Sequence, residues 1–136
     1  MKKLINLTIA ATAAMTLTTS LYAMDGKKDC DVKVNGIEKV IATANVYNDL
    51  AKKKGLEFRR LNVNNTDLIK SVEEAIKTGA KEVNPMHFKG KKKSKTKLET
   101  NYAAERACKF AIAALTQAKE AETSWRLAVP GDGYKY

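Results

Sequence analysis

The densest concentration of chemically active side chains is a run of lysines in residues 89–97. Six of these nine residues are lysine and none is acidic. Like charges repel, so we expect the segment to be extended and mobile unless a polyanion neutralises it. The predicted anion-binding side chains are Lys89, Lys91, Lys92, Lys93, Lys95 and Lys97. The competing interpretation is a solubilising basic loop without a partner.

A second cationic pair, Arg59 and Arg60, is a candidate extension of this patch. The lysine run itself contains no arginine, and lysine is a hydrated point charge, so we expect salt-sensitive and weakly selective binding. Specific nucleic-acid recognition is not expected. Residues 34–38 resemble the helix-hairpin-helix DNA-binding loop, but Glu38 stands where that loop has its second glycine, and no family is assigned.

The two cysteines, Cys30 and Cys108, are predicted to form one structural disulfide. Such a bridge would close a loop of about 78 residues and contribute roughly 4 to 5 kcal/mol in the chain-entropy model. The spacing matches no C-x-x-C redox pair or haem site. His87 is the single histidine, and Met86 beside it supplies too few ligands for a metal site. No metal or cofactor is expected.

Catalytic chemistry also finds little support. Any histidine-based triad would have to pass through His87, and no serine lies in a nucleophile-elbow motif. The remaining carboxylate pairs, Glu73 with Glu74 and Glu120 with Glu122, are neighbours on predicted helices, where such groups are usually solvated. We therefore expect a non-catalytic protein.

The first 23 residues have the pattern of a secretory signal peptide: Lys2 and Lys3, an apolar run over 4–15, and a small residue at Ala23. The run is shorter than the ~20 residues that span a bilayer. The residues before Cys30 are charged, which argues against a lipoprotein. The prediction is a periplasmic or secreted protein comprising residues 24–136, with a formal net charge lowered from +10 to +8 by the loss of two lysines.

Three helices should position these groups. The first is predicted to begin at Asn35, which would cap it together with Glu38, and to end at lysines before Gly55. The second is predicted over 67–78, stopped by Gly79. The third is predicted over 97 to about 122, because Thr96 and Glu99 match a capping box and the segment holds eight alanines without Gly or Pro. Cys108 lies on its apolar face.

The expected fold is therefore mainly α: a small, single-domain three-helix fold stapled by one disulfide. An α/β or α+β alternative remains open, with short strands near 31–34 and 56–63. That alternative needs residues 81–88 as a further strand, which Pro85 would confine to a sheet edge.

The C-terminal tail, 125–136, offers Trp125, Tyr134 and Tyr136 as candidate partner-binding residues around a Pro-Gly turn. Two functional hypotheses follow. The first is a binding protein for anionic envelope material, whose partner is an anionic polymer or an acidic envelope protein. The second is an accessory or structural subunit of an envelope complex that docks through the Ala-rich third helix and this tail.

Overall fold

A computed structural model describes residues 25–88, 90 and 92–128, without the side chains of 123 and 125–128. The predicted signal peptide, Lys89, Lys91 and the end of the tail lie outside these residues. In chain order the elements are α1 (Gly26–Asp29), α2 (Val32–Asn35), α3 (Ile37–Lys53), β1 (Arg59–Arg60), β2 (Val63–Asn64), α4 (Asn65–Thr78), β3 (Glu82–Val83), β4 (Leu98–Glu99) and α5 (Thr100–Ala128). The mainly helical prediction is confirmed, with two short two-stranded sheets added.

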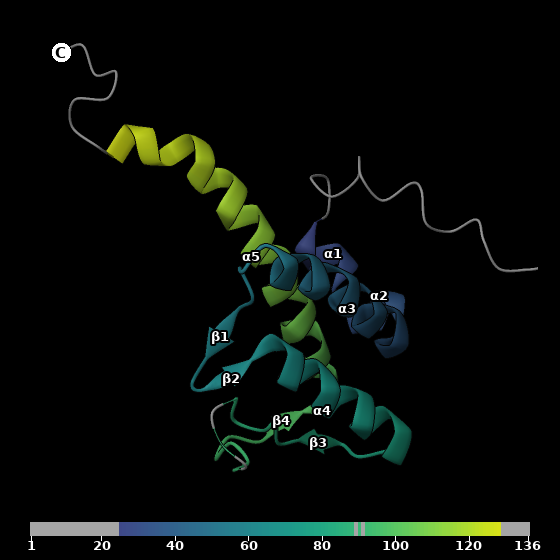
Figure 1. Ribbon diagram of the computed structural model, residues 1–136. Coiled ribbons are helices and arrows are strands. Elements are labelled where there is room, and N and C mark those ends of the chain that lie inside the picture. The colour runs from purple at the N-terminus through teal and green to yellow at the C-terminus, as the bar shows by residue number, and fades with distance from the viewer. Residues whose placement is uncertain (1–24, 89, 91, 129–136) are drawn as a thin grey trace, which may run out of the picture.

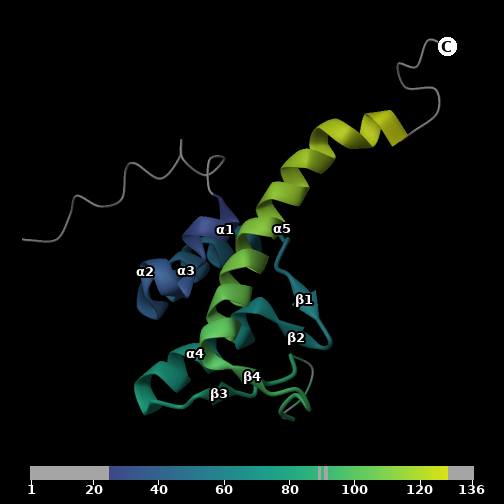
Figure 2. The same ribbon diagram turned by 180° about the vertical axis from the view of Figure 1, so that it is seen from behind.

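The long helix α5 is the axis of the fold. Figures 1 and 2 show it passing through the body of the molecule and projecting beyond it at its C-terminal end. Its small side chains let α3 and α4 approach closely, and the predicted inward face is confirmed. The buried alanines of this face, each at most 9 % exposed, are Ala103, Ala104, Ala107, Ala111 and Ala114. Val40, Ile69 and Val72 complete the centre of the core from α3 and α4.

The predicted disulfide between Cys30 and Cys108 is present, with a Cα–Cα distance of 5.6 Å and both residues fully buried. It attaches the turn between α1 and α2 to the N-terminal half of α5. A carboxylate oxygen of Glu105 also accepts a hydrogen bond from the Val32 amide, at 3.2 Å. Neither short helix contains a fully buried residue, so these two links, together with the partly buried Val32 that packs against the core, hold the N-terminal segment in place.

In this N-terminal segment, one part of the open α/β alternative and one expected helix cap are wrong. Residues 31–34 do not form a strand, because the Asp31 side chain accepts hydrogen bonds from the first amides of α2 and starts a helical turn. Asn35 does not cap the first long helix. Its side chain donates to the Lys28 carbonyl at 2.7 Å, and Gly36, at φ 80°, precedes α3 instead.

The predicted helix ends at glycine are confirmed. Gly55 (φ 71°) and Gly79 (φ 69°) follow α3 and α4 in left-handed conformations, which an L side chain adopts at a cost. Helix α4 begins at Asn65 rather than 67, because the Asn64 side chain accepts a hydrogen bond from the Asp67 amide at 3.1 Å.

The third long helix begins later than expected. The predicted capping box of Thr96 and Glu99 is wrong, because residues 98 and 99 pair with β3 as a strand. The helix starts at Thr100, whose amide donates to the Lys81 carbonyl at 2.9 Å and whose hydroxyl donates to the Ala80 carbonyl at 2.7 Å. These tertiary bonds replace the local cap. The helix then continues to Ala128 rather than about 122.

The ambiguous segment 56–63 contributes to an antiparallel hairpin in which Arg59 pairs with Asn64 and Arg60 with Val63. Leu61 (φ 50°) and Asn62 (φ 63°) form its two-residue turn. Positive φ at both central residues is typical of a type I′ turn. Asparagine tolerates that conformation, whereas leucine is rare in it.

Candidate ligand-binding surface and pocket

The described part of the lysine run pairs with the segment that precedes it. We call the paired residues 85–88 and 92–94 the lysine hairpin. Met86 and Lys93 form an antiparallel bridge. The His87 amide donates to the Lys92 carbonyl at 3.0 Å, and the Ser94 amide donates to the Pro85 carbonyl at 2.8 Å. The pairing involves backbone groups only, and the described lysine side chains are exposed to solvent. Because water screens the charges, repulsion between the lysines does not prevent the hairpin from forming.

This lysine hairpin lies against the β1–β2 hairpin. The Phe88 amide donates to the Asn62 carbonyl at 2.9 Å, and the Arg59 guanidinium lies 4.8 Å from the centre of the Phe88 ring. Two basic segments that are distant in sequence are thereby joined. We call their exposed cations the basic surface: Arg59, Arg60, Lys92, Lys93, Lys95 and Lys97.

The basic surface has little charge compensation from the protein. Among the described residues, the ion pairs within 4 Å join Lys97 to Glu82 (3.8 Å) and Lys109 to Glu105 (3.3 Å). The first pair is well exposed, and such pairs contribute little to stability. The other cations of the basic surface have no acidic partner in the part of the chain that the structure describes.

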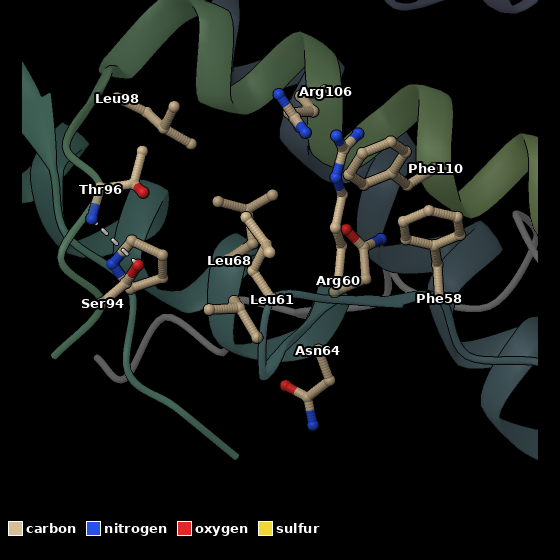
Figure 3. Close-up of a pocket in the computed structure, with 13 residues that line it drawn as sticks. Phe58, Arg60, Leu61, Asn64, Leu68, Ser94, Thr96, Leu98, Arg106 and Phe110 are labelled. Carbon is tan, nitrogen blue, oxygen red and sulfur yellow. Dashed lines mark hydrogen bonds between the residues drawn. The ribbon is translucent and has the colours of Figure 1, made fainter. Parts of the chain in front are cut away.

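A pocket of about 260 Å³ opens beside the basic surface, between the two hairpins and α5. Figure 3 shows its side chains converging from β1–β2, α4, the segment before β4, and α5. The lining residues are Phe58, Arg60, Leu61, Val63, Asn64, Asn65, Leu68, Pro85, Ser94, Thr96, Leu98, Arg106 and Phe110.

The pocket wall is mostly apolar. Phe58 and Phe110 stack with their ring centres 4.0 Å apart and form one end. Leu68 is buried, whereas Leu61 is 72 % exposed although it lines the same pocket. The hairpin turn therefore holds a large apolar side chain at the pocket in an unfavourable backbone conformation.

Two arginines supply the charge of the pocket. The Arg106 guanidinium lies 5.0 Å from the centre of the Phe110 ring, and one of its nitrogens donates to the Tyr102 hydroxyl at 3.0 Å. Figure 3 shows the Arg60 side chain extending toward the same end of the pocket. Neither arginine has an acidic partner within 4 Å among the described residues.

A buried polar network fixes the start of α4 beneath the pocket. The Asn65 amide nitrogen donates to the Asn48 side-chain oxygen at 3.1 Å and to the Ala107 carbonyl at 2.9 Å. The Asn48 amide nitrogen donates to the Thr66 hydroxyl at 3.0 Å, and that hydroxyl donates to Glu57. The network connects α3, α4 and α5 and so holds the pocket wall in place.

Glu57 is the ionised end of this network. Burial acts to raise its pKa, but hydrogen bonds from the Thr66 side chain and amide and from Asn48, with the charge of Lys52, outweigh burial and lower the pKa overall. The carboxylate therefore remains charged and accepts these bonds at neutral pH. Its role here is to position Thr66 and the start of α4.

The other candidate residues are not brought together into a site by the described structure. His87 takes part in the lysine hairpin through its backbone, and Met86 is 37 % exposed. No cluster of three or more His, Cys, Asp or Glu side chains suited to a metal ion occurs among residues 25–88, 90 and 92–128. The Trp125 side chain, Tyr134 and Tyr136 lie outside the described residues.

No known protein family, curated protein or solved structure matches this chain. Among the described helices, none has both the length and the apolar character needed to cross a bilayer.

The cations of the basic surface are evident in the sequence, whereas the pocket is not. Arg106 and Phe110 lie in the alanine-rich helix, where their types suggest only a helical surface, and Phe58 lies in the ambiguous segment 56–63. The one local signal for the hairpin beside the pocket was Asn62, because asparagine is common in two-residue β-turns. This signal predicts a turn only when the residues on either side pair as strands.

Proposed function

We propose that this protein is an exported, non-catalytic binding protein for anionic polymers of the cell envelope, and that the basic surface is its binding site. The observation that carries the proposal is the contact between the two hairpins through Phe88 and Asn62. This contact joins cations from residues 59–60 and 92–97 into one patch. A patch of one sign attracts polyanions and raises their local concentration.

Export is supported by the signal-peptide pattern of residues 1–23 and by the disulfide. Disulfides persist in oxidising compartments such as the periplasm and are rare in the cytosol of mesophiles. The bridge between Cys30 and Cys108 lies in the core and closes a large loop, as expected of a structural rather than a catalytic disulfide.

The chemistry of the basic surface indicates which polymers it favours. Its lysines are mobile point donors without a planar fork, so they suit repeating phosphate or carboxylate groups more than one precise arrangement. Neutralising about five anionic groups should release their counterions and give a log–log salt slope of roughly −3 to −4, by analogy with single-stranded polyanions. A steep slope with little sequence or sugar selectivity is the expected signature.

The experiment is co-sedimentation of the purified, oxidised protein with separated outer-membrane and cell-wall fractions at low and high salt. The test variant replaces Lys92, Lys93 and Lys95 with glutamate. We expect binding to one fraction that is lost at high salt and in the variant. Unchanged binding of the variant, or binding that is indifferent to salt, would exclude the basic surface as the binding site.

A matched control carries the same change in net charge elsewhere. Lys39, Lys70 and Lys77 are exposed cations on α3 and α4 outside the basic surface. Their replacement with glutamate should leave most of the binding intact. Equal loss in the two triple variants would show that total charge, rather than the joined patch, is responsible.

A second candidate function is supported by the shape of α5. Figures 1 and 2 show that its C-terminal part projects from the body. Gln117 and Ala121 in the second half of α5 are exposed. The alanine face nearer the start of α5 is already occupied by α3 and α4. An accessory subunit would therefore dock through the projecting part and the following tail. This mode predicts salt-tolerant association that is lost when residues 116–136 are removed.

A further inference from the structure

The pocket differs from the basic surface in the kind of ligand it suits. Its walls combine the stacked pair Phe58 and Phe110 with aliphatic side chains, so an occupant gains by burying apolar area. A polymer chain with charges along its length would leave that wall in contact with polar groups. The pocket therefore favours a compact apolar body.

The volume limits the size of that body. An engineered apolar cavity of about 150 Å³ accepts a benzene molecule. On that scale a pocket of 260 Å³ accommodates a ligand of roughly ten non-hydrogen atoms. This size corresponds to a short acyl chain or to one aromatic ring with a short side chain.

The two arginines determine the head group. Guanidinium groups bind carboxylates through paired N–H donors, and Arg106 is already oriented by its stacking on Phe110 and its bond to Tyr102. Arg60 extends toward the same end of the pocket (Figure 3). Arg60 and Arg106 line one apolar pocket and have no acidic partner nearby, so they create a positive potential in it. An anionic head group would be attracted by this potential and would neutralise it.

Leu61 provides an independent indication of an apolar ligand. It is 72 % exposed, lines the pocket and has φ 50°, a conformation that asparagine or glycine adopts more readily. Residues held in such conformations cluster at ligand clamps and active sites. The exposed Leu61 side chain would be buried, and its unfavourable backbone conformation offset, if it covered an apolar ligand in the pocket.

From these observations we infer that the pocket between the two hairpins and α5 binds a small monocarboxylate of roughly ten non-hydrogen atoms in total, most of them in its apolar body. Arg60 and Arg106 bind the carboxylate, and Leu61 and Leu68 enclose the apolar body. This site goes beyond the binding of polymers proposed above and does not depend on it.

The test is methyl NMR titration of the purified, oxidised protein with two probes, octanoate and 3-phenylpropionate. We expect saturable 1:1 binding that shifts the methyl signals of Leu61, Leu68 and Leu98. The probe that binds more tightly identifies an alkyl or an aryl body. 1-Octanol, 3-phenylpropan-1-ol and acetate should each bind at least about tenfold more weakly, because each lacks either the charge or the apolar body.

The variants Arg60→Gln and Arg106→Gln should each weaken carboxylate binding by about tenfold while changing alcohol binding little. The Arg60 side chain makes no hydrogen bond or ion pair with another described residue, so its variant remains informative if Arg106→Gln disturbs the aromatic stack. The matched control is Lys39→Gln on α3, which does not line the pocket. It should leave the affinity for both probes unchanged.

Three results would overturn the inference: no saturable binding of either acid at millimolar concentration, equal affinity for the acids and the alcohols, or equal weakening by Lys39→Gln and Arg60→Gln. Failure here is separable from failure of the proposed function. The Lys92, Lys93 and Lys95 variant should lose polymer binding and keep its affinity for the acids, whereas Arg106→Gln should keep polymer binding and bind the acids about tenfold more weakly.

Discussion

Removing the disulfide is a perturbation whose effect on the free energy of unfolding can be calculated from the structure. Cys30 and Cys108 are 78 residues apart in sequence, and both are fully buried. In the chain-entropy model, opening a loop of this length lowers the free energy of unfolding by about 4.5 kcal/mol at 25 °C. A domain of this size has an unfolding entropy of roughly 0.2 kcal/mol/K, so the melting temperature should fall by about 20 °C.

The structure also predicts where the damage begins. Helices α1 and α2 contribute no buried residue, and apart from the disulfide their described polar link to α5 is the bond from Val32 to Glu105. After the bridge is opened, residues 26–35 should detach before the rest of the fold. Their amides should therefore lose hydrogen-exchange protection at denaturant concentrations where α3 and α4 remain protected.

The assay is urea denaturation of three forms: the oxidised protein, the same protein under reductant, and the double variant Cys30→Ala with Cys108→Ala. The reduced protein retains both cysteine side chains, so its comparison with the double variant separates the loss of the cross-link from the loss of the side-chain atoms. A reduced form whose free energy of unfolding stays within about 1 kcal/mol of the oxidised form would refute the reasoning, because the model requires a much larger loss.

Two further perturbations test the hairpin turn and the buried network. Leu61→Asn should raise the free energy of unfolding, measured by urea denaturation, by about 1 kcal/mol, because asparagine adopts the left-handed conformation more readily than leucine. A lower free energy of unfolding in this variant would show that Leu61 is not strained. The lowered pKa of Glu57 means that its charged form stabilises the fold, so this contribution is complete above the ordinary value of 4.5 and is lost as pH falls through the lower folded-state pKa. Glu57→Gln should flatten the acid side of a plot of stability against pH, and an unchanged slope would count against the network.

The three long helices could be predicted because their signals are local. The alanine-rich face around Cys108, the recurring apolar residues of α3 and α4, and the glycines at 55 and 79 each act within a few turns of chain. The disulfide was predictable because two cysteines allow a single intramolecular pairing. Local patterns gave wrong predictions where residues distant in sequence form the actual contacts. Residues 98 and 99 pair with β3 instead of forming the first turn of a helix capped by Thr96. The helix begins instead at Thr100, which bonds to the carbonyls of Lys81 and Ala80.

Local residue patterns were sufficient to specify the helical class, the pairing of the cysteines and the identity of the cations. The next level of organisation was not local. The sequence could not place those cations relative to one another, because the bond from Phe88 to Asn62 and the ring contact with Arg59 join segments that no periodicity connects. The pocket likewise exists only after α4, α5 and the two hairpins have packed together. Both features depend on tertiary contacts, since each draws its residues from several segments that become neighbours only when the core has formed.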